Sequence, residues 1–220
     1  MKKIRVIQYG LGAMGSMMAK LILQKRDLEL VGVIIKSPEK HGKDLGDVLN
    51  LKKKTGILCT NKPEELLQEE KADILLHAAV SYVPEVWNQI KPAVKAGINV
   101  ITIAEEMGYP FLKYPALSKE IHETAKKNKV SVLGTGINPG FAMDYLPLSL
   151  TSILHHVEMI HVTRLVDFSP FGPAIQHNIG IGLSKQDFEK RSKPKNSPAT
   201  SDYQNHSTSS QTHSAGRSTT

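Results

Sequence analysis

Cysteine and aromatic residues are scarce in this sequence, which has one cysteine, Cys59, and 5% aromatic side chains among 220 residues. A single cysteine excludes a disulfide within the chain and a zinc site built from several cysteines. No apolar run reaches the roughly 20 residues of a membrane-spanning helix, and the N-terminal apolar stretch is too short for a secretory signal. These absences favour a cytoplasmic protein. The hydrophobic content of 40% suffices for one full domain and part of another.

The net charge of +7 lacks the pattern of a nucleic-acid surface. Lysines are scattered, apart from the run at residues 52–54 and the pair Lys126 and Lys127, and aromatic side chains do not alternate with them. Nucleic-acid surfaces combine clustered cations with stacking aromatics. We therefore expect a small anionic cofactor as partner, and neither nucleic acid nor a membrane.

Six apolar runs of strand type alternate with helical segments through the first 138 residues. Runs of β-branched residues alternating with helices predict a parallel sheet covered on both faces, a doubly wound α/β fold of Rossmann type. The runs span residues 4–9, 28–35, 55–60, 72–80, 98–104 and 130–138. Residues 1–138 are therefore predicted to form a dinucleotide-binding domain.

The pattern changes after residue 138, where an incomplete second α/β domain is predicted at residues 139–191. Its first part, 139–154, looks helical, and residues 157–169 alternate like an opening strand. Ser184, with Asp187 three residues later, predicts a capped helix start. Residues 192–220 contain no Val, Ile, Leu, Met or Phe, so we predict a disordered tail.

Three glycines with the spacing G-x-G-x-x-G follow the first apolar run directly. In a dinucleotide site Gly10 makes the tight turn, Gly12 lets the diphosphate approach, and Gly15 allows close packing of helix on strand. The spacing is a weak signal alone, but a strand before it and an amphipathic helix after it supply the required context. A turn without a ligand remains the alternative. The predicted cofactor-binding residues of this loop are Gly10, Leu11, Gly12, Ala13, Met14 and Gly15.

The residue about 20 positions beyond the glycines determines the preference between NAD and NADP. A carboxylate there binds the adenosine ribose of NAD, whereas a cation accommodates the 2′-phosphate of NADP. Ile35, Lys36 and Ser37 occupy this place, and none is acidic. We therefore expect NADP or NAD with NADP favoured, and Lys36 and Ser37 as phosphate contacts. The alternative is a solvated Lys36.

The chain resembles the 2,4-diaminopentanoate dehydrogenases, within the dihydrodipicolinate reductase-like NAD(P)-dependent dehydrogenases, over about residues 3–191. The segments that carry the resemblance are YGLGAMG, HGKDLGDVL, ITIAEEMGYP, VLGTGINPGFAMDYLPLSLT and IGIGLSKQDFE. It implies NAD(P)-dependent oxidative deamination of a small amino acid, 2,4-diaminopentanoate, to 2-amino-4-oxopentanoate and ammonia, by a homo-oligomer.

Members of this family are longer, and a Ser/Thr-rich tail stands here where the substrate domain would continue. An altered C-terminus that inactivates the enzyme is one interpretation. Reduction of a cyclic imine, as in dihydrodipicolinate reductase, is an alternative, although the histidine- and lysine-rich catalytic stretch of that enzyme is absent. A nucleotide-binding module without catalysis is another.

Deamination of a diamino acid needs a base for one amine and a group that holds the other ammonium. Ligands of open α/β sheets lie across the carboxyl ends of the strands, which selects polar residues that follow the apolar runs. The candidate catalytic residues are Glu105, Glu106, Asn138 and Asp144. At the end of the fourth run, Ala78, Ala79 and Ser81 are expected to border the nicotinamide ribose.

Each of these candidates also has a structural reading. One of the two glutamates is expected to face solvent, Asn138 before a proline suits a turn, and Asp144 could simply complement a helix N-terminus. The histidines have no carboxylate or cysteine at ligand spacing, so we expect no metal site.

Overall fold

The computed structural model describes residues 2–68, 71–167, 176 and 180–191. The chain divides into two compact units, Met1–Gly136 and Ile137–Thr220, close to the predicted boundary at residue 138. The predicted disordered tail lies outside the described residues.

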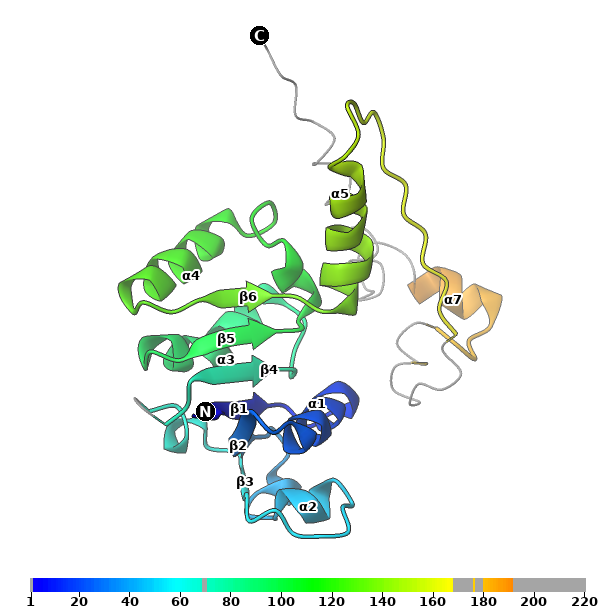
Figure 1. Ribbon diagram of the computed structural model, residues 1–220. Coiled ribbons are helices and arrows are strands. Elements are labelled where there is room, and N and C mark those ends of the chain that lie inside the picture. Colours follow the sequence, from blue (N-terminus) through cyan, green and yellow to red (C-terminus); the bar gives the residue numbers. More distant parts are fainter. Residues whose placement is uncertain (1, 69–70, 168–175, 177–179, 192–220) are drawn as a thin grey trace. The chain divides into compact units, whose positions relative to one another are not determined.

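The first unit is built on a six-stranded parallel sheet with the order β3-β2-β1-β4-β5-β6. Figure 1 shows the strands stacked in this order, with β6 at one edge and β3 at the other. The strands are β1 (Ile4–Tyr9), β2 (Leu28–Ile34), β3 (Cys59–Thr60), β4 (Ile74–His77), β5 (Asn99–Thr102) and β6 (Val132–Gly134). The predicted Rossmann-type sheet is confirmed, and its strand order reverses between β1 and β4, where ligands of such sheets bind.

Helices connect the strands and cover both faces of the sheet. They are α1 (Ala13–Gln24), α2 (Leu45–Val48), α3 (Val83–Lys95) and α4 (Pro115–Lys127), with 3₁₀ turns at Pro38–Lys40, Pro63–Glu65 and Glu105–Gly108. Alternate strand residues face opposite sides. Val6 and Val33 therefore pack in the core beneath α1 and α2, whereas Ile7 and Ile34 belong to the core beneath α3 and α4.

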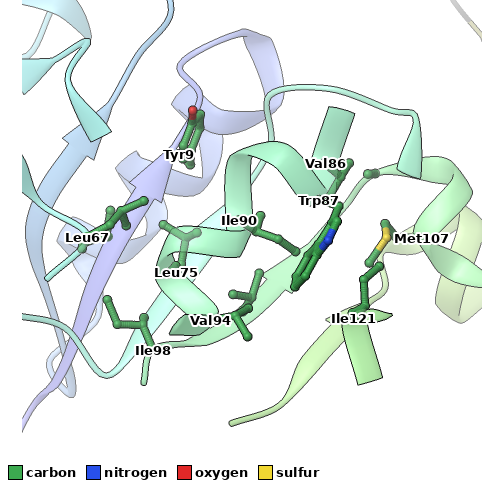
Figure 2. Packing of buried hydrophobic residues seen from close by; sticks show 14 of the residues in the cluster. Tyr9, Leu67, Leu75, Val86, Trp87, Ile90, Val94, Ile98, Met107 and Ile121 are labelled. Atoms are coloured by element: carbon green, nitrogen blue, oxygen red, sulfur yellow. The ribbon is translucent and has the colours of Figure 1, made fainter. Parts of the chain in front are cut away.

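Helix α3 contributes the largest share of the second core. Figure 2 shows Val86, Trp87, Ile90 and Val94 of this helix gathered in one apolar layer with Leu75 of β4. Full burial of such a side chain stabilises a fold by about 1.5–3 kcal/mol. This packing fixes α3 against the face of the sheet that β4 and β5 form.

An ion pair fixes the chain where it enters β4. The backbone amide and guanidinium of Arg5 donate to the carboxylate of Asp73 at 2.7, 2.9 and 3.3 Å. Hydrogen bonds from Arg5 lower the pKa of Asp73 to about 2. Asp73 thus stays ionised and aligns β4 with β1, so that the carboxyl ends of the two parallel strands lie on the same side of the sheet.

The HGKDLGDVL stretch, one of those that carry the family resemblance, is structural. Asp44 is 8% exposed, and its carboxylate accepts hydrogen bonds from the amides of Gly46, Thr55 and Gly56 at 2.7–3.0 Å. These bonds, with that from Thr55 first, hold the pKa of Asp44 below its ordinary value. A side chain at Gly46 would meet the carbonyl of Lys53 at 2.5 Å. This motif therefore folds the loop between β2 and β3.

The second unit contains the π-helix Ile137–Tyr145, whose backbone leaves helical angles at Asn138, Pro139 and Gly140, and the helices α5 (Leu146–Thr151) and α7 (Lys185–Arg191). Helical structure therefore covers much of the stretch predicted at residues 139–154, and Pro147 sits in the first turn of α5, where a missing amide costs nothing. The hydroxyl of Ser184 accepts from the amide of Asp187 at 3.2 Å and donates to its carboxylate at 2.7 Å. The predicted helix start at Ser184 is confirmed.

The strand predicted at residues 157–169 is wrong for the part that the structure describes. Residues 157–167 form no strand, and Leu165 within this segment is 99% exposed. A strand is stable only where its backbone groups pair with a neighbour. The described residues of this unit contain no other strand with which the segment could pair.

Candidate nucleotide-binding and active site

The glycine loop joins β1 to α1 with the geometry of a phosphate-binding turn. Gly10 has φ +95°, and a Cβ there would lie 2.5 Å from the carbonyl oxygen of Ala78. A Cβ at Gly15 would lie 2.1 Å from the carbonyl oxygen of Gly10. Only glycine fits these two positions, as the motif predicts.

Gly12 differs, because a Cβ there would meet nothing within 4 Å. It caps α1 without a side-chain hydrogen bond, and the first amides of a helix have no partner inside the helix. Those amides and the positive end of the helix dipole suit an anionic group. The residues present therefore fit the diphosphate of a dinucleotide.

A cavity of about 490 Å³ opens beside this loop. Its lining comes from the ends of β1, β2 and β4, from the turns after β2 and β3, and from α3. The lining residues are Tyr9, Gly10, Leu11, Gly12, Ile35, Lys36, Ser37, Lys40, Asn61, Pro63, Ala78, Ala79 and Gln89. Apolar groups and a few convergent polar groups are typical of a cofactor site.

Most residues predicted to bind the cofactor meet at this cavity. The predicted residues in its lining are Gly10, Leu11, Gly12, Lys36, Ser37, Ala78 and Ala79. Ala13, Met14 and Gly15 form the first turn of α1 beside it. Ser81 lies outside the lining, and its carbonyl accepts from the amide of Glu106 at 3.2 Å.

The lining residues that were not predicted from the sequence include Lys40, Asn61 and Gln89. Lys40 ends the turn after β2, and its ammonium donates to the carbonyl of Leu11 in the glycine loop at 3.4 Å. The spacing of Lys40, four residues after Lys36, is the one feature of the sequence that could have indicated a second cation at this site. Asn61 and Gln89 reach the cavity only through folding.

The two adjacent glutamates after β5 have different surroundings. Glu106 is 6% exposed, its carboxylate accepts from the amide of Val83 at 3.1 Å, and it forms an ion pair with Lys113. These contacts anchor the N-terminus of α3, so they give Glu106 a structural task. The half-buried carboxylate of Glu105 makes no hydrogen bond or ion pair with the described residues.

Asn138 and Asp144 both belong to the segment Ile137–Tyr145 of the second unit. The amide oxygen of Asn138 is buried and has no hydrogen-bond partner among the described residues. Asp144 accepts from the amide of Gly140 at 2.7 Å and so holds the turn that follows Asn138.

Two further observations bear on the kind of site. Within the described ranges, His, Cys, Asp and Glu side chains form no group of three or more that could hold a metal ion. In the same ranges, every helix is too short or too polar to span a membrane.

The strand order of the parallel sheet reverses beside a glycine loop, and the start of α1 leaves open space at Gly12. This combination defines a dinucleotide-binding protein of Rossmann type. A family model of the dihydrodipicolinate reductase N-terminus matches residues 4–102. A model of the 2,4-diaminopentanoate dehydrogenase C-terminal domain matches residues 141–196.

Relatives agree with these matches. A 2,4-diaminopentanoate dehydrogenase of Acetoanaerobium sticklandii is 40% identical over 195 residues, which cover 86% of this chain and 54% of the relative. A 4-hydroxy-tetrahydrodipicolinate reductase of Mastigocladus laminosus is 26% identical over 182 residues, covering 78% of this chain and 62% of the relative. The solved structure of an amine dehydrogenase from Mycobacterium smegmatis superposes with a TM-score of 0.75 at 28% identity, covering 94% of this chain and 60% of that one.

The resemblance of the chain to the 2,4-diaminopentanoate dehydrogenases, within the dihydrodipicolinate reductase-like dehydrogenases, is confirmed. It spans 54% of the diaminopentanoate relative and 62% of the reductase relative.

Proposed function

We propose that the protein is an NAD(P)-dependent amine dehydrogenase that oxidatively deaminates a small diamino acid, 2,4-diaminopentanoate, to 2-amino-4-oxopentanoate and ammonia. The observation that carries the proposal is the open cradle at Gly12 beside a cavity of dinucleotide-binding type. The similarity to 2,4-diaminopentanoate dehydrogenase supports the choice of substrate.

The bound nicotinamide would supply the acceptor for the hydride that leaves the carbon bearing the amine. The first amides of α1 would hold the diphosphate, and Ala78 and Ala79, which line the cavity, would border the cofactor. Glu105 follows β5 at the carboxyl edge of the sheet. Its free carboxylate takes the proton from the reacting ammonium and leaves a neutral amine, the form from which hydride can depart.

For the second unit we propose a role in substrate binding that rests on its own geometry. The unpartnered amide oxygen of Asn138 is an acceptor suited to an ammonium group. Asp144 keeps the turn in place through Gly140. Water then adds to the oxidised carbon–nitrogen bond, which yields the ketone and releases ammonia.

A substrate panel tests the activity. Small diamino acids, including 2,4-diaminopentanoate, are incubated with NAD or NADP while formation of reduced cofactor is followed. Reduction with the diamino acid, lost in Glu105→Gln, is the expected result. Oxidation of NAD(P)H by a cyclic imine would instead favour the reductase alternative. Tight cofactor binding without turnover of any substrate would favour a non-catalytic nucleotide-binding module.

NADPH is expected to bind more tightly than NADH. Lys36, Ser37 and Lys40 all line the cavity, whose described lining contains no carboxylate. A charge-assisted hydrogen bond to a phosphate contributes about 1.5–3 kcal/mol, which is about tenfold to a hundredfold in affinity. Exposure to solvent keeps the effect near the lower figure.

The preference for NADPH over NADH is expected to be smaller in Lys36→Ala, Lys40→Ala and Ile35→Asp, as measured by dissociation constants at low salt. Lys20→Ala is the matched control, because Lys20 is exposed on α1 and is not part of the lining. Equal dissociation constants for the two cofactors in the unmodified protein would contradict the assignment.

A further inference from the structure

Gln89 of α3 lines the cavity together with the glycine loop, and its orientation is set from behind by a histidine. His77 is fully buried at the end of β4. Its Nε2 lies 2.9 Å from Oε1 of Gln89, and its Nδ1 lies 2.9 Å from the hydroxyl of Thr102. The three side chains form one chain of hydrogen bonds.

The oxygen of Gln89 determines which way the protons point along this chain, because a carboxamide oxygen can only accept a hydrogen bond and Nε2 of His77 must therefore donate. The hydroxyl oxygen of Thr102 accepts a hydrogen bond from the amide of Ala104 at 3.1 Å, so its own proton is available to Nδ1 of His77. Burial lowers the pKa of His77, which favours the neutral form of the ring. Nδ1 therefore accepts, and the ring proton resides on Nε2 and is donated to Gln89.

The amide nitrogen of the Gln89 side chain remains available to a ligand. Its carboxamide oxygen accepts from His77, and its amide nitrogen has no hydrogen-bond partner among the described residues. Because the oxygen is held, the carboxamide cannot flip without breaking the bond to His77. Gln89 thus faces the cavity as a donor.

The other lining residues indicate which part of a bound dinucleotide would lie next to the amide nitrogen of Gln89. The glycine loop marks the diphosphate, and Lys36 with Ser37 marks the adenosine ribose. The same lining also carries apolar side chains at Ile35 and Pro63, which suit the faces of a flat base.

We propose that Gln89 donates a hydrogen bond to ring nitrogen N1 of the cofactor's adenine, and that His77 and Thr102 act as positioning residues that keep its carboxamide in the donating orientation. The proposal rests on the dinucleotide binding of the proposed function. It makes Gln89 a determinant of base specificity, because adenine N1 is an acceptor whereas N1 of hypoxanthine carries a proton.

The test compares dissociation constants for NADH and its hypoxanthine analogue by fluorescence titration. The unmodified protein is expected to favour adenine by about three- to tenfold, the size of one hydrogen bond. Gln89→Leu should abolish the preference. Gln89→Glu should reverse it, since a carboxylate held by His77 accepts from the hypoxanthine N1–H. Asn88→Leu, on the exposed neighbour outside the lining, should leave the preference unchanged.

Thr102→Val tests the positioning chain, because it removes the proton that fixes the tautomer of His77. A reduced base preference in a folded variant is expected, while the salt dependence of binding stays unchanged. Binding of NADH with the same base preference in Gln89→Leu as in the unmodified protein would overturn this inference alone. Failure of the unmodified protein to bind any dinucleotide would overturn the proposed function and the inference with it.

Discussion

Gly12→Val is expected to abolish dinucleotide binding while the protein still folds. A Cβ at Gly12 meets nothing within 4 Å, so the domain tolerates the side chain. The same side chain would enter the cavity beside the first amides of α1 and displace the diphosphate. Loss of two charge-assisted hydrogen bonds raises the dissociation constant about a hundredfold or more. Fluorescence titration with NADPH measures the affinity, and circular dichroism confirms the fold.

Gly15→Ala is the matched control for this experiment. Its Cβ would lie 2.1 Å from the carbonyl oxygen of Gly10 and 2.8 Å from the carbonyl carbon, and backbone atoms cannot yield as a flexible side chain can. We expect a lower melting temperature from this variant, in contrast to Gly12→Val. A folded Gly12→Val protein that binds NADPH with unchanged affinity would show that no diphosphate approaches this loop.

Glu106→Ala is expected to destabilise the first unit strongly. The substitution leaves the amide of Val83, a fully buried residue, without the carboxylate that accepts from it at 3.1 Å. An unsatisfied buried donor costs about 1–3 kcal/mol. Lys113, whose side chain is 43% exposed, is rehydrated, so the lost ion pair adds only about 0–1 kcal/mol. Urea denaturation should show a loss of about 2–3 kcal/mol.

Glu105→Ala provides the comparison, since the neighbouring carboxylate makes no hydrogen bond or ion pair with described residues. Its stability should change by less than about 0.5 kcal/mol, while turnover of the diamino acid is lost. The opposite pattern, a stable Glu106→Ala without activity beside an active Glu105→Ala, would exchange the roles of the two residues.

Local signals in the sequence predicted the parts of the site that depend on one segment. Gly10 and Gly15 are needed because a turn and a helix meet within six residues, and this requirement is visible in the spacing of the motif. Lys36 and Ser37 follow from counting along one βα unit, and both line the cavity. The strand predicted at residues 157–169 failed because alternation describes a face and says nothing of a pairing partner.

The amino-acid sequence alone determined the class of this protein: a parallel α/β sheet with a dinucleotide-binding loop. These properties follow from apolar periodicity and from backbone requirements of single glycines, which act over a few residues. Only the tertiary structure decided that Glu106 anchors α3, that Lys40 reaches the glycine loop, and that His77 orients Gln89. Each of these contacts joins residues 12 to 29 positions apart, and such pairs meet only after packing has set the strands and helices side by side.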